Sequence, residues 1–412
     1  MTIQRVATVG SDYQEDDSEK GSIGCGRHCL GKCCLPVSRL PLYLYKKDGN
    51  VPIEAGMVES SEEVSEISFL RDLLLVEWEN RKKRGLFRHD VTKNETKSIA
   101  GQHGFIVQLN EERLLKKRPT EFRLDQVLQP FDGNKFNFTK VGQEEALFLF
   151  EQSSDHKSHF VPNAPVEKIS TSPNVVAINV SPLEYGHVLL IPRILDSLPQ
   201  RIDNDSFLLA VHMAKEAADP YFRVGYNSLG AFATINHLHF QAYYLAATLP
   251  AEKVPTQRIP VDEELHSRGI YVSQLLNYPV RGLVFEGGNS IRDLSDAVAC
   301  RLVFLQNNNI PFNVLISDCG KRIFLFFQCY AERRALGQVS QEIIDTQVNP
   351  AVWEVSGHFL LKRREDFEAA SEAFVCKLLS DVSLSEERFQ EVKAYIMNLK
   401  VEEASESSEA DA

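Results

Sequence analysis

Two histidines and a glutamine alternate with apolar residues near the middle of the chain. They are His237, His239 and Gln241. The apolar alternation over 233–245 predicts a strand, in which alternate side chains point to opposite faces, so the three polar groups are expected on one face. A neutral imidazole can attack an electrophile near pH 7, because its usual pKa is about 6.5. The spacing indicates nucleophilic chemistry, with the central His239 as the attacking group.

A phosphoryl centre is the electrophile that suits such a histidine. Attack on the α-phosphate of a nucleotide would give a phosphoramidate, from which a second nucleophile takes the nucleotidyl group. Thr234 and the backbone amides of 230–236 are candidates to hold the phosphoryl oxygens. Histidines two positions apart also occur in metal sites, which here would need a third ligand such as His187. From these residues alone, both uses stay open.

Four of the eight cysteines gather near the beginning of the chain, at Cys25, Cys29, Cys33 and Cys34. Zinc binding is one interpretation. Adjacent cysteines are poorly placed to ligate one tetrahedral ion together, so we expect reduced thiols and no metal site. The other four cysteines lie in apolar segments and are expected in the core.

Composition excludes several classes of protein. The chain has 412 residues, 43% of them hydrophobic, which suits a globular protein of about two domains. The formal net charge of -12 argues against a general nucleic-acid binder. No run of about 18 apolar residues occurs, so no membrane span is expected. Residues 1–20 are polar and acidic, without the pattern of a signal or transit peptide, and we expect a cytosolic or nuclear protein.

The elements that must position the histidines follow from hydrophobic periodicity. Strands are predicted at 40–45, 105–109, 175–180, 187–192, 233–245, 280–286, 312–317, 322–330 and 357–361. Helices are predicted at 65–83, 205–218, 290–307 and 366–399. Helices packed on antiparallel sheet define an α+β fold.

Further candidate ligand-binding residues lie outside the histidine segment. Phe alternates with polar residues over 135–140, which predicts a strand that either faces a ligand or is only half-exposed. Asn137 and Lys140 from this stretch, and Asn179 from the strand at 175–180, are candidate substrate-binding residues. The basic group 116–118, with Arg123, would either steer phosphates or form a solvated face.

The chain also contains a degenerate internal repeat. Residues 323–330 align with 236–243 without a gap, and Phe324 and Phe326 stand at the two histidine positions. We infer two related halves, only the first of which carries the chemistry. The predicted organisation is an irregular Cys/Gly-rich segment at 1–36, a catalytic half at 37–250, a connector at 251–275, a degenerate half at 276–400 and a disordered acidic tail at 401–412.

The motifs around the histidines resemble a known superfamily. The pattern Pro182-x3-Gly186-His187-x-Leu189-x-Ile191-Pro192, followed by Asn227 and then Thr234-x2-His237-x-His239-x-Gln241, is similar to the histidine-triad proteins. Gln in the last place resembles the transferase branch, which includes the galactose-1-phosphate uridylyltransferases. The stretches at 25–31, 115–123, 230–241 and 349–354 are similar to the plant GDP-L-galactose phosphorylases, and the resemblance covers roughly residues 1–395.

The resemblance implies a histidine-triad-like α+β fold with two related halves, each a mainly antiparallel sheet with packed helices. It implies transfer of a guanylyl group from a GDP-hexose to inorganic phosphate, in L-ascorbate synthesis, by a homodimer without a cofactor. Carried over by position, His239 is the nucleophile, His237 supports it, and Gln241 binds the guanylyl phosphate. Asn227 and Thr234 would contact phosphate or ribose.

Other assignments remain beside this one. His187 is expected to be structural, since it begins a core strand. A GDP-D-glucose phosphorylase or a uridylyl transferase would share the same motif spacing, because base and hexose are chosen elsewhere. A regulator that binds GDP-sugars without turnover is a further alternative, and a zinc protein is another.

Overall fold

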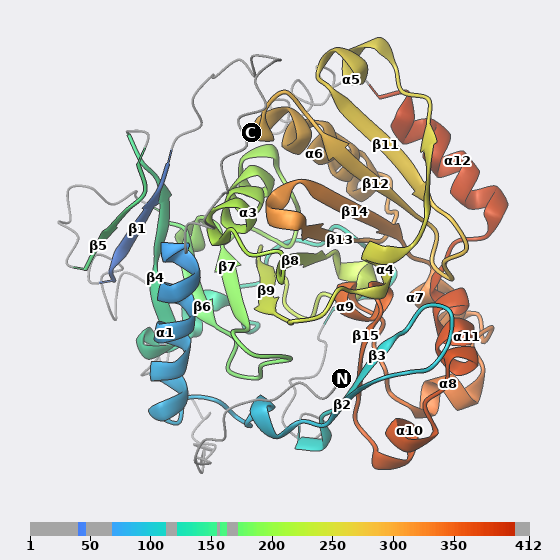
Figure 1. Ribbon diagram of the computed structural model, residues 1–412, viewed down its shortest axis with the longest axis horizontal. Helices are drawn as coiled ribbons and strands as arrows, with labels where there is room; N and C mark the ends of the chain where they lie inside the picture. The colour runs from blue at the N-terminus through green and yellow to red at the C-terminus, as the bar shows by residue number, and fades with distance from the viewer. Residues whose placement is uncertain (1–39, 47–67, 113–121, 155–156, 163–171, 400–412) are drawn as a thin grey trace, which may run out of the picture.

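The computed structural model describes residues 40–46, 68–112, 122–154, 157–162 and 172–399. One large sheet crosses this part of the protein, with helices on both of its faces and a small second sheet beside it (Figure 1). The N-terminal cysteine cluster, the basic group 116–118 and the acidic tail lie outside the described residues. Within those ranges, no helix has the length and apolar character needed to cross a membrane.

The large sheet has twelve strands in the described part of the chain, and only β1 and β4 pair in parallel. In order across the sheet they are β10 (Thr256–Ile259), β11 (Ile270–Leu275), β12 (Gly282–Gly287), β14 (Arg322–Phe327), β13 (Phe312–Ser317), β8 (Phe222–Asn227), β9 (Phe240–Tyr244), β7 (Val188–Ile191), β6 (Val175–Ile178), β4 (Ala146–Gln152), β1 (Leu42–Tyr45) and β5 (His159–Val161).

The two halves of the chain meet edge to edge at the β8–β13 pair, where Asn227 lies opposite Asn313. Outward from this pair the order is β8-β9-β7-β6 on one side and β13-β14-β12-β11 on the other. In both halves a helix separates the second strand in the chain from the third: α3 (Asn204–Ala217) and α6 (Ile291–Asn307). Two related halves are therefore confirmed, but their sheets are fused into one rather than separate.

The repeat predicted from sequence is right in topology and wrong in alignment. The gap-free alignment places Phe327 on Phe240, yet β14 ends at Phe327 whereas β9 begins at Phe240. The two strands are equivalent only after a shift along the chain. A short apolar run aligns well in several registers, because strand sequences carry little information beyond alternation.

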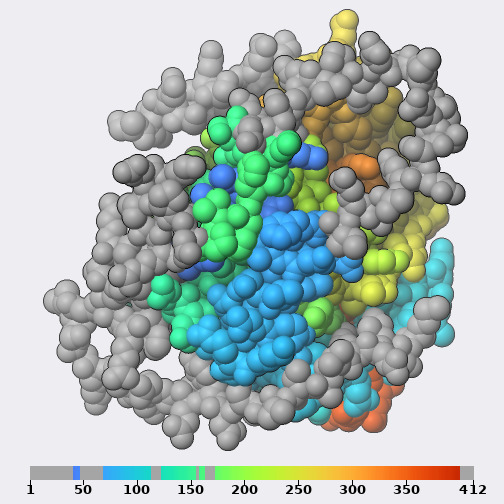
Figure 2. Space-filling view, turned by 60° about the vertical axis from the view of Figure 1, so that its left-hand side comes forward, coloured from blue at the N-terminus to red at the C-terminus, as the bar shows by residue number. Residues whose placement is uncertain are grey.

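One face of the sheet is covered by α3, α6, α1 (Phe69–Lys83) and α12 (Glu386–Met397). Apolar residues of these helices and of both halves of the sheet form one continuous core. Helix α3 begins at Asp203, whose carboxylate accepts the backbone N–H of Ser206. Figure 2 shows α1 at the molecular surface beside the strands of the first half. These helices hold β8 and β9, and hence the segment before β9, in place.

The opposite face is built differently in the two halves. A three-stranded sheet, β15 (His358–Leu361), β3 (Ile106–Leu109) and β2 (Thr96–Ser98), joins a strand from the second half to two from the first. Near it lie α4 (Pro250–Lys253), α7 (Tyr330–Ala335), α8 (Gln341–Asp345), α9 (Val352–Val355), α10 (Arg364–Ala369) and α11 (Glu372–Val382) (Figure 1). Helix α5 (Glu263–Ser267) lies apart from them beside β11, and its Leu265 belongs to the core shared with α3 and α6. Helix α9 packs on β8 and β15.

Three predicted segments differ from the structure. Residues 251–275, expected as a connector, contain most of α4 and all of β10, α5 and β11. The polar residues Thr256, Gln257 and Arg258 of β10 are accommodated because β10 is an edge strand. The strand predicted over 135–140 is a turn and a short 3-10 helix at Phe138–Lys140. Its cap residue Asn137 accepts the backbone N–H of Thr139, and this local bond competes with strand pairing.

The third segment contains the histidines. The strand predicted over 233–245 is regular only at Phe240–Tyr244, and residues 233–239 approach it as a loop. The backbone N–H of Leu238 donates to the carbonyl of Leu198, and that of His239 to the side chain of Gln200. The alternation of faces persists: Leu238 and Phe240 enter the helix-side core, whereas His239 and Gln241 line a cavity on the other side.

Candidate active site

His239 is held by its backbone and by one ring nitrogen. Its Nδ1 lies 2.8 Å from the carbonyl oxygen of His237 and 3.0 Å from Oε1 of Gln200. A carbonyl oxygen can only accept, so Nδ1 carries the hydrogen and Nε2 keeps its lone pair. No described residue is a hydrogen-bond partner of Nε2, and His239 lines a cavity of about 310 Å³. This is the tautomer that a nucleophilic histidine needs.

The charge state of His239 also suits attack. Burial lowers its pKa to about 4, and the hydrogen bond to the His237 carbonyl acts in the opposite direction. The imidazole is therefore neutral at pH 7, and its lone pair is available without deprotonation by a base. A neutral group is favoured here because burial disfavours the imidazolium.

His237 supports His239 by holding its surroundings in place, not by reacting itself. Its ring is fully buried, and its Nδ1 accepts the backbone N–H of Phe138 at 3.1 Å. The N–H can only donate, so the ring hydrogen is on Nε2, which is buried without a hydrogen-bond partner. Burial and the nearby His239 lower the pKa of His237 to about 3. His237 positions the loop at Phe138 with its ring and His239 with its carbonyl.

A cavity of about 310 Å³ opens beside His239 on the face of the sheet opposite α3. Phe136, Phe138, Val180 and Leu189 give it apolar walls, and Phe138 also stands edge-on to the His239 ring at 4.9 Å between centroids. Its polar lining includes the predicted residues Lys140, Asn179, Thr234 and Gln241. It also includes Arg88, Glu144 and Glu145, which were not predicted. Its size and mixed lining are typical of a small-molecule site.

The predicted residues divide into those that line this cavity and those that do not. Lys140 lines it, while its ammonium donates to the carbonyls of Asn134 and Lys135. Asn179 lines it and accepts the backbone N–H of Ser181. Asn137 does not line it, because its amide is used in the turn that ends at Lys140.

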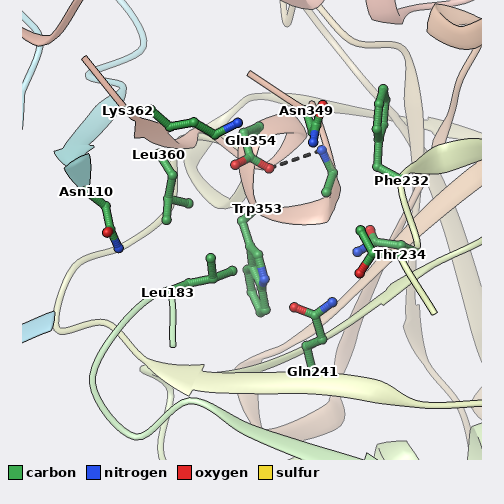
Figure 3. A pocket seen from close by; sticks show the side chains of 12 residues that line it. Asn110, Leu183, Phe232, Thr234, Gln241, Asn349, Trp353, Glu354, Leu360 and Lys362 are labelled. Atoms are coloured by element: carbon green, nitrogen blue, oxygen red, sulfur yellow. Dashed lines mark hydrogen bonds between the residues drawn. The ribbon is translucent and has the colours of Figure 1, made fainter. Parts of the chain in front are cut away.

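A second, smaller cavity of about 60 Å³ adjoins the first, and both are lined by Thr234 and Gln241. Figure 3 shows Gln241 and Thr234 facing side chains from the second half of the chain. Those from the second half are Asn349, Ala351, Trp353, Glu354, Leu360 and Lys362, and the first half adds Asn110, Leu183, Asn227 and Phe232. The second half, predicted to lack chemistry, therefore forms much of the wall next to Gln241.

The side chain of Asn227 bonds to two residues of the second half. Its Oδ1 accepts Nδ2 of Asn313 at 2.6 Å and the backbone N–H of Val352 at 2.8 Å. Only its amide nitrogen is left for the smaller cavity, which it lines. Asn227 thus places α9 through its Oδ1, and its contact with phosphate or ribose stays a prediction.

Other predicted groups have ordinary structural surroundings. His187 is fully buried, and its Nδ1 accepts the backbone N–H of Leu183 at 2.8 Å. Arg123 forms an exposed ion pair with Asp125. Among the residues that the structure describes, no group of three His, Cys, Asp or Glu side chains is arranged to hold a metal ion.

Sequence reasoning missed Gln200 and gave no role to the residues of α9. Gln200 lies in a loop 39 positions before His239, and no pattern connects the two. Trp353 and Glu354 lie in the stretch 349–354 that carried the family resemblance, so a signal existed, but periodicity could not attach it to the first half.

Known proteins match this chain in sequence and in fold. The model "GDPGP1-like, N-terminal domain" matches residues 69–243, and "GDPGP1-like, C-terminal domain" matches 250–403. The chain is 62% identical over 396 residues to GDP-L-galactose phosphorylase 1 of Arabidopsis thaliana, with 96% of this chain and 88% of the relative covered. It is 32% identical to GDP-D-glucose phosphorylase 1 of Homo sapiens, with 79% and 82% covered.

The fold has a counterpart among solved structures. The yeast Ap4A phosphorylase Apa2 superimposes with a TM-score of 0.50 at 15% identity, covering 77% of this chain and 95% of that chain. At this identity the likeness concerns the fold alone. The histidine-triad-like α+β fold expected from the motifs is confirmed.

Proposed function

The chain belongs to the GDPGP1-like family, and on that premise we propose that it is a phosphorylase that converts GDP-L-galactose and phosphate to L-galactose 1-phosphate and GDP. The observation that carries the proposal is the state of His239. It is a buried, neutral imidazole at the lining of the larger cavity, whose Nδ1–H is fixed and whose Nε2 has no hydrogen-bond partner among the described residues.

The reaction has two displacements at the α-phosphorus. Nε2 of His239 attacks it, the bond to the bridging oxygen breaks, and L-galactose 1-phosphate leaves with that oxygen. An oxygen of inorganic phosphate then attacks the same phosphorus, the P–N bond breaks, and GDP forms with the imidazole restored. Splitting the transfer in this way replaces one difficult step with two easier ones.

The chain supplies the groups that this chemistry needs around the phosphorus. The backbone N–H groups of Thr234 and Ile235, at the edge of the larger cavity, form no hydrogen bond with described residues and are available to phosphate oxygens. Lys140 and Arg88 add positive charge to the lining, and Glu144 and Glu145 add negative charge. Donors fixed in advance stabilise charge that develops in the transition state.

Gln241 favours transfer to phosphate over hydrolysis. Its side-chain amide lines both cavities and can hydrogen-bond a phosphate oxygen. An amide cannot take a proton from an attacking water as an imidazole can, so the guanylylated enzyme persists until phosphate arrives.

The choice of L-galactose over D-glucose rests on the difference between the two relatives. The identity to the GDP-L-galactose phosphorylase is almost twice that to the GDP-D-glucose phosphorylase. The proposal also includes a homodimer, which the family resemblance alone supports, and a location in the cytosol or nucleus. Light scattering on the purified protein and a fluorescent fusion test these two points.

Mass spectrometry and product assays test the proposal. Protein mixed with GDP-L-galactose in the absence of phosphate should gain the mass of a guanylyl group, and His239→Ala should not. With phosphate, turnover should be fastest with GDP-L-galactose, slower with GDP-D-glucose and weakest with UDP-hexoses. Equal rates with UDP-hexoses would overturn the guanine assignment, and turnover without any adduct would exclude the covalent route.

A further inference from the structure

We propose, resting on the proposed function, that the smaller cavity binds the hexose of the sugar nucleotide and that α9 of the second half forms its recognition wall. The residues that would select the sugar are Asn349, Trp353, Glu354 and Lys362. The second half thereby acts in specificity although it carries no reactive histidine.

The hexose is assigned to the smaller cavity because of where the phosphates must lie relative to His239. His239 lines only the larger cavity, whereas Gln241 and Thr234 line both. Alternate positions of an extended chain are about 7 Å apart, so a phosphate bound near Gln241 is adjacent to one attached to His239. The apolar walls at Phe136, Phe138 and Leu189 suit the nucleoside, which leaves the smaller cavity for the departing hexose phosphate.

The lining of the smaller cavity has the chemistry of a sugar site. Hydroxyl groups both donate and accept, and here they would meet the amides of Asn110 and Asn349, the carboxylate of Glu354 and the ammonium of Lys362. Figure 3 shows Lys362 and Glu354 on the side opposite Gln241, with the Trp353 ring between them.

Trp353 supplies the most specific sign of a ligand. The residue is 1% exposed, and its buried indole N–H has no hydrogen-bond partner among the residues that the structure describes. Figure 3 places the ring between Leu183 and Gln241, with its nitrogen on the side of Gln241. Buried indole N–H groups usually have an acceptor, and a sugar hydroxyl would provide one.

The wall is fixed in place before any ligand arrives. Trp353 packs on Tyr243 of β9, with 4.0 Å between ring centroids. Oε2 of Glu354 accepts the backbone N–H of Ala351 at 3.1 Å, and Asn227 holds the backbone of Val352. A binding surface that needs no rearrangement loses little entropy when it is occupied.

The carboxylate favours a sugar over the acceptor phosphate as occupant. Inorganic phosphate beside the nearly buried Glu354 would bring two anions together where screening by water is weak. A carboxylate is, in contrast, a strong acceptor for hydroxyl groups. The acceptor phosphate then takes the place of the sugar's own phosphate, near Gln241.

Measuring the two half-reactions separately tests the hexose site independently of the proposed function. Exchange of labelled phosphate into GDP uses His239 and the guanylylated enzyme but involves no hexose. Glu354→Gln should lower kcat/KM for GDP-L-galactose about tenfold or more, while the exchange rate stays within about twofold of the parent. Trp353→Phe, which keeps an aromatic ring but replaces the indole and removes its N–H, should act in the same direction. Glu342→Gln, in an exposed pair with Lys377 of the same half, should change neither reaction.

The other outcomes overturn the inference. If Glu354→Gln lowers exchange as much as it lowers turnover of GDP-L-galactose, the cavity serves the phosphate or the nucleotide instead. If Glu354→Gln and Trp353→Phe leave turnover of GDP-L-galactose unchanged, the cavity holds no sugar. Failure of the unmodified protein to exchange phosphate into GDP would instead contradict the proposed function. Thermal unfolding of each variant identifies any that fails to fold, and the remaining variant then decides.

Discussion

The side chain of Gln200 holds His239 at two points. Its Oε1 accepts the backbone N–H of His239 at 2.9 Å and lies 3.0 Å from Nδ1 of the ring. Its own amide donates to the carbonyls of Asn227 and His239 at 3.0 and 3.2 Å. Gln200 therefore joins His239 to β8, and in the proposed mechanism it is a positioning residue.

Gln200→Leu should lower kcat about 10- to 100-fold and leave KM for the GDP-hexose nearly unchanged, because the ring loses orientation without losing substrate contacts. Stopped-flow formation of the guanylyl adduct would measure the effect on the first step. Gln338→Leu, at an exposed position, is the matched control. A rise in KM with kcat intact would contradict the positioning role.

His237 should tolerate asparagine better than glutamine. Oδ1 of asparagine lies close to the position of Nδ1, which accepts the backbone N–H of Phe138, whereas the oxygen of glutamine lies farther out. His237→Ala leaves that N–H unpaired and should cost about 1–3 kcal/mol in the free energy of unfolding. Denaturant unfolding of the three variants would test this order, and equal stability of the Asn and Gln variants would refute it.

Acid should destabilise the protein through its two active-site histidines. Their folded-state pKa values, about 4 for His239 and about 3 for His237, lie below the usual 6.5. As the pH falls below 6.5, the unfolded chain takes up protons first, so stability is complete above 6.5 and is lost towards pH 3–4. The slope should reach about 1.4 kcal/mol per pH unit for each histidine.

The measurement is urea unfolding from pH 7.5 to 4.5 on the parent and on a His237→Asn/His239→Asn double variant. Other groups titrate alike in both proteins, so the difference isolates the two imidazoles. A parallel pH dependence in parent and variant would mean that the histidines are not buried as neutral groups.

Gly225 controls how closely α9 approaches β8. A Cβ at this position would lie 2.7 Å from Cγ1 of Val352 and 3.1 Å from the ring of Trp353. Gly225→Ala should displace the wall of the smaller cavity and destabilise the fold by about 1–3 kcal/mol. Turnover of GDP-L-galactose should fall more than exchange of phosphate into GDP.

Gly133→Ala is the matched control, since its Cβ would meet nothing closer than 3.9 Å. Steady-state kinetics and thermal unfolding of both variants would settle the point. If Gly225→Ala matches Gly133→Ala in both measurements, contact between β8 and α9 does not place the wall.

The sequence alone determined the fold class, the two halves and the family, and it singled out the histidine segment. Alternation put Leu238 and Phe240 into the core and left His239 and Gln241 for the cavity, because side-chain direction is a local property of extended backbone. The motif spacing within 182–241 is also a local property. It identified the segment correctly even though part of the predicted strand is a loop.

Only the tertiary structure decided what surrounds that segment. Gln200 reaches His239 because the loop at 198–200 pairs with the chain before β9, and α9 reaches Gln241 because β8 and β13 join the two halves into one sheet. These contacts connect residues 39 and more than 100 positions apart, and no periodicity encodes such a pairing. The tautomers of the two histidines are also set there, since each depends on whether its Nδ1 meets a donor or an acceptor.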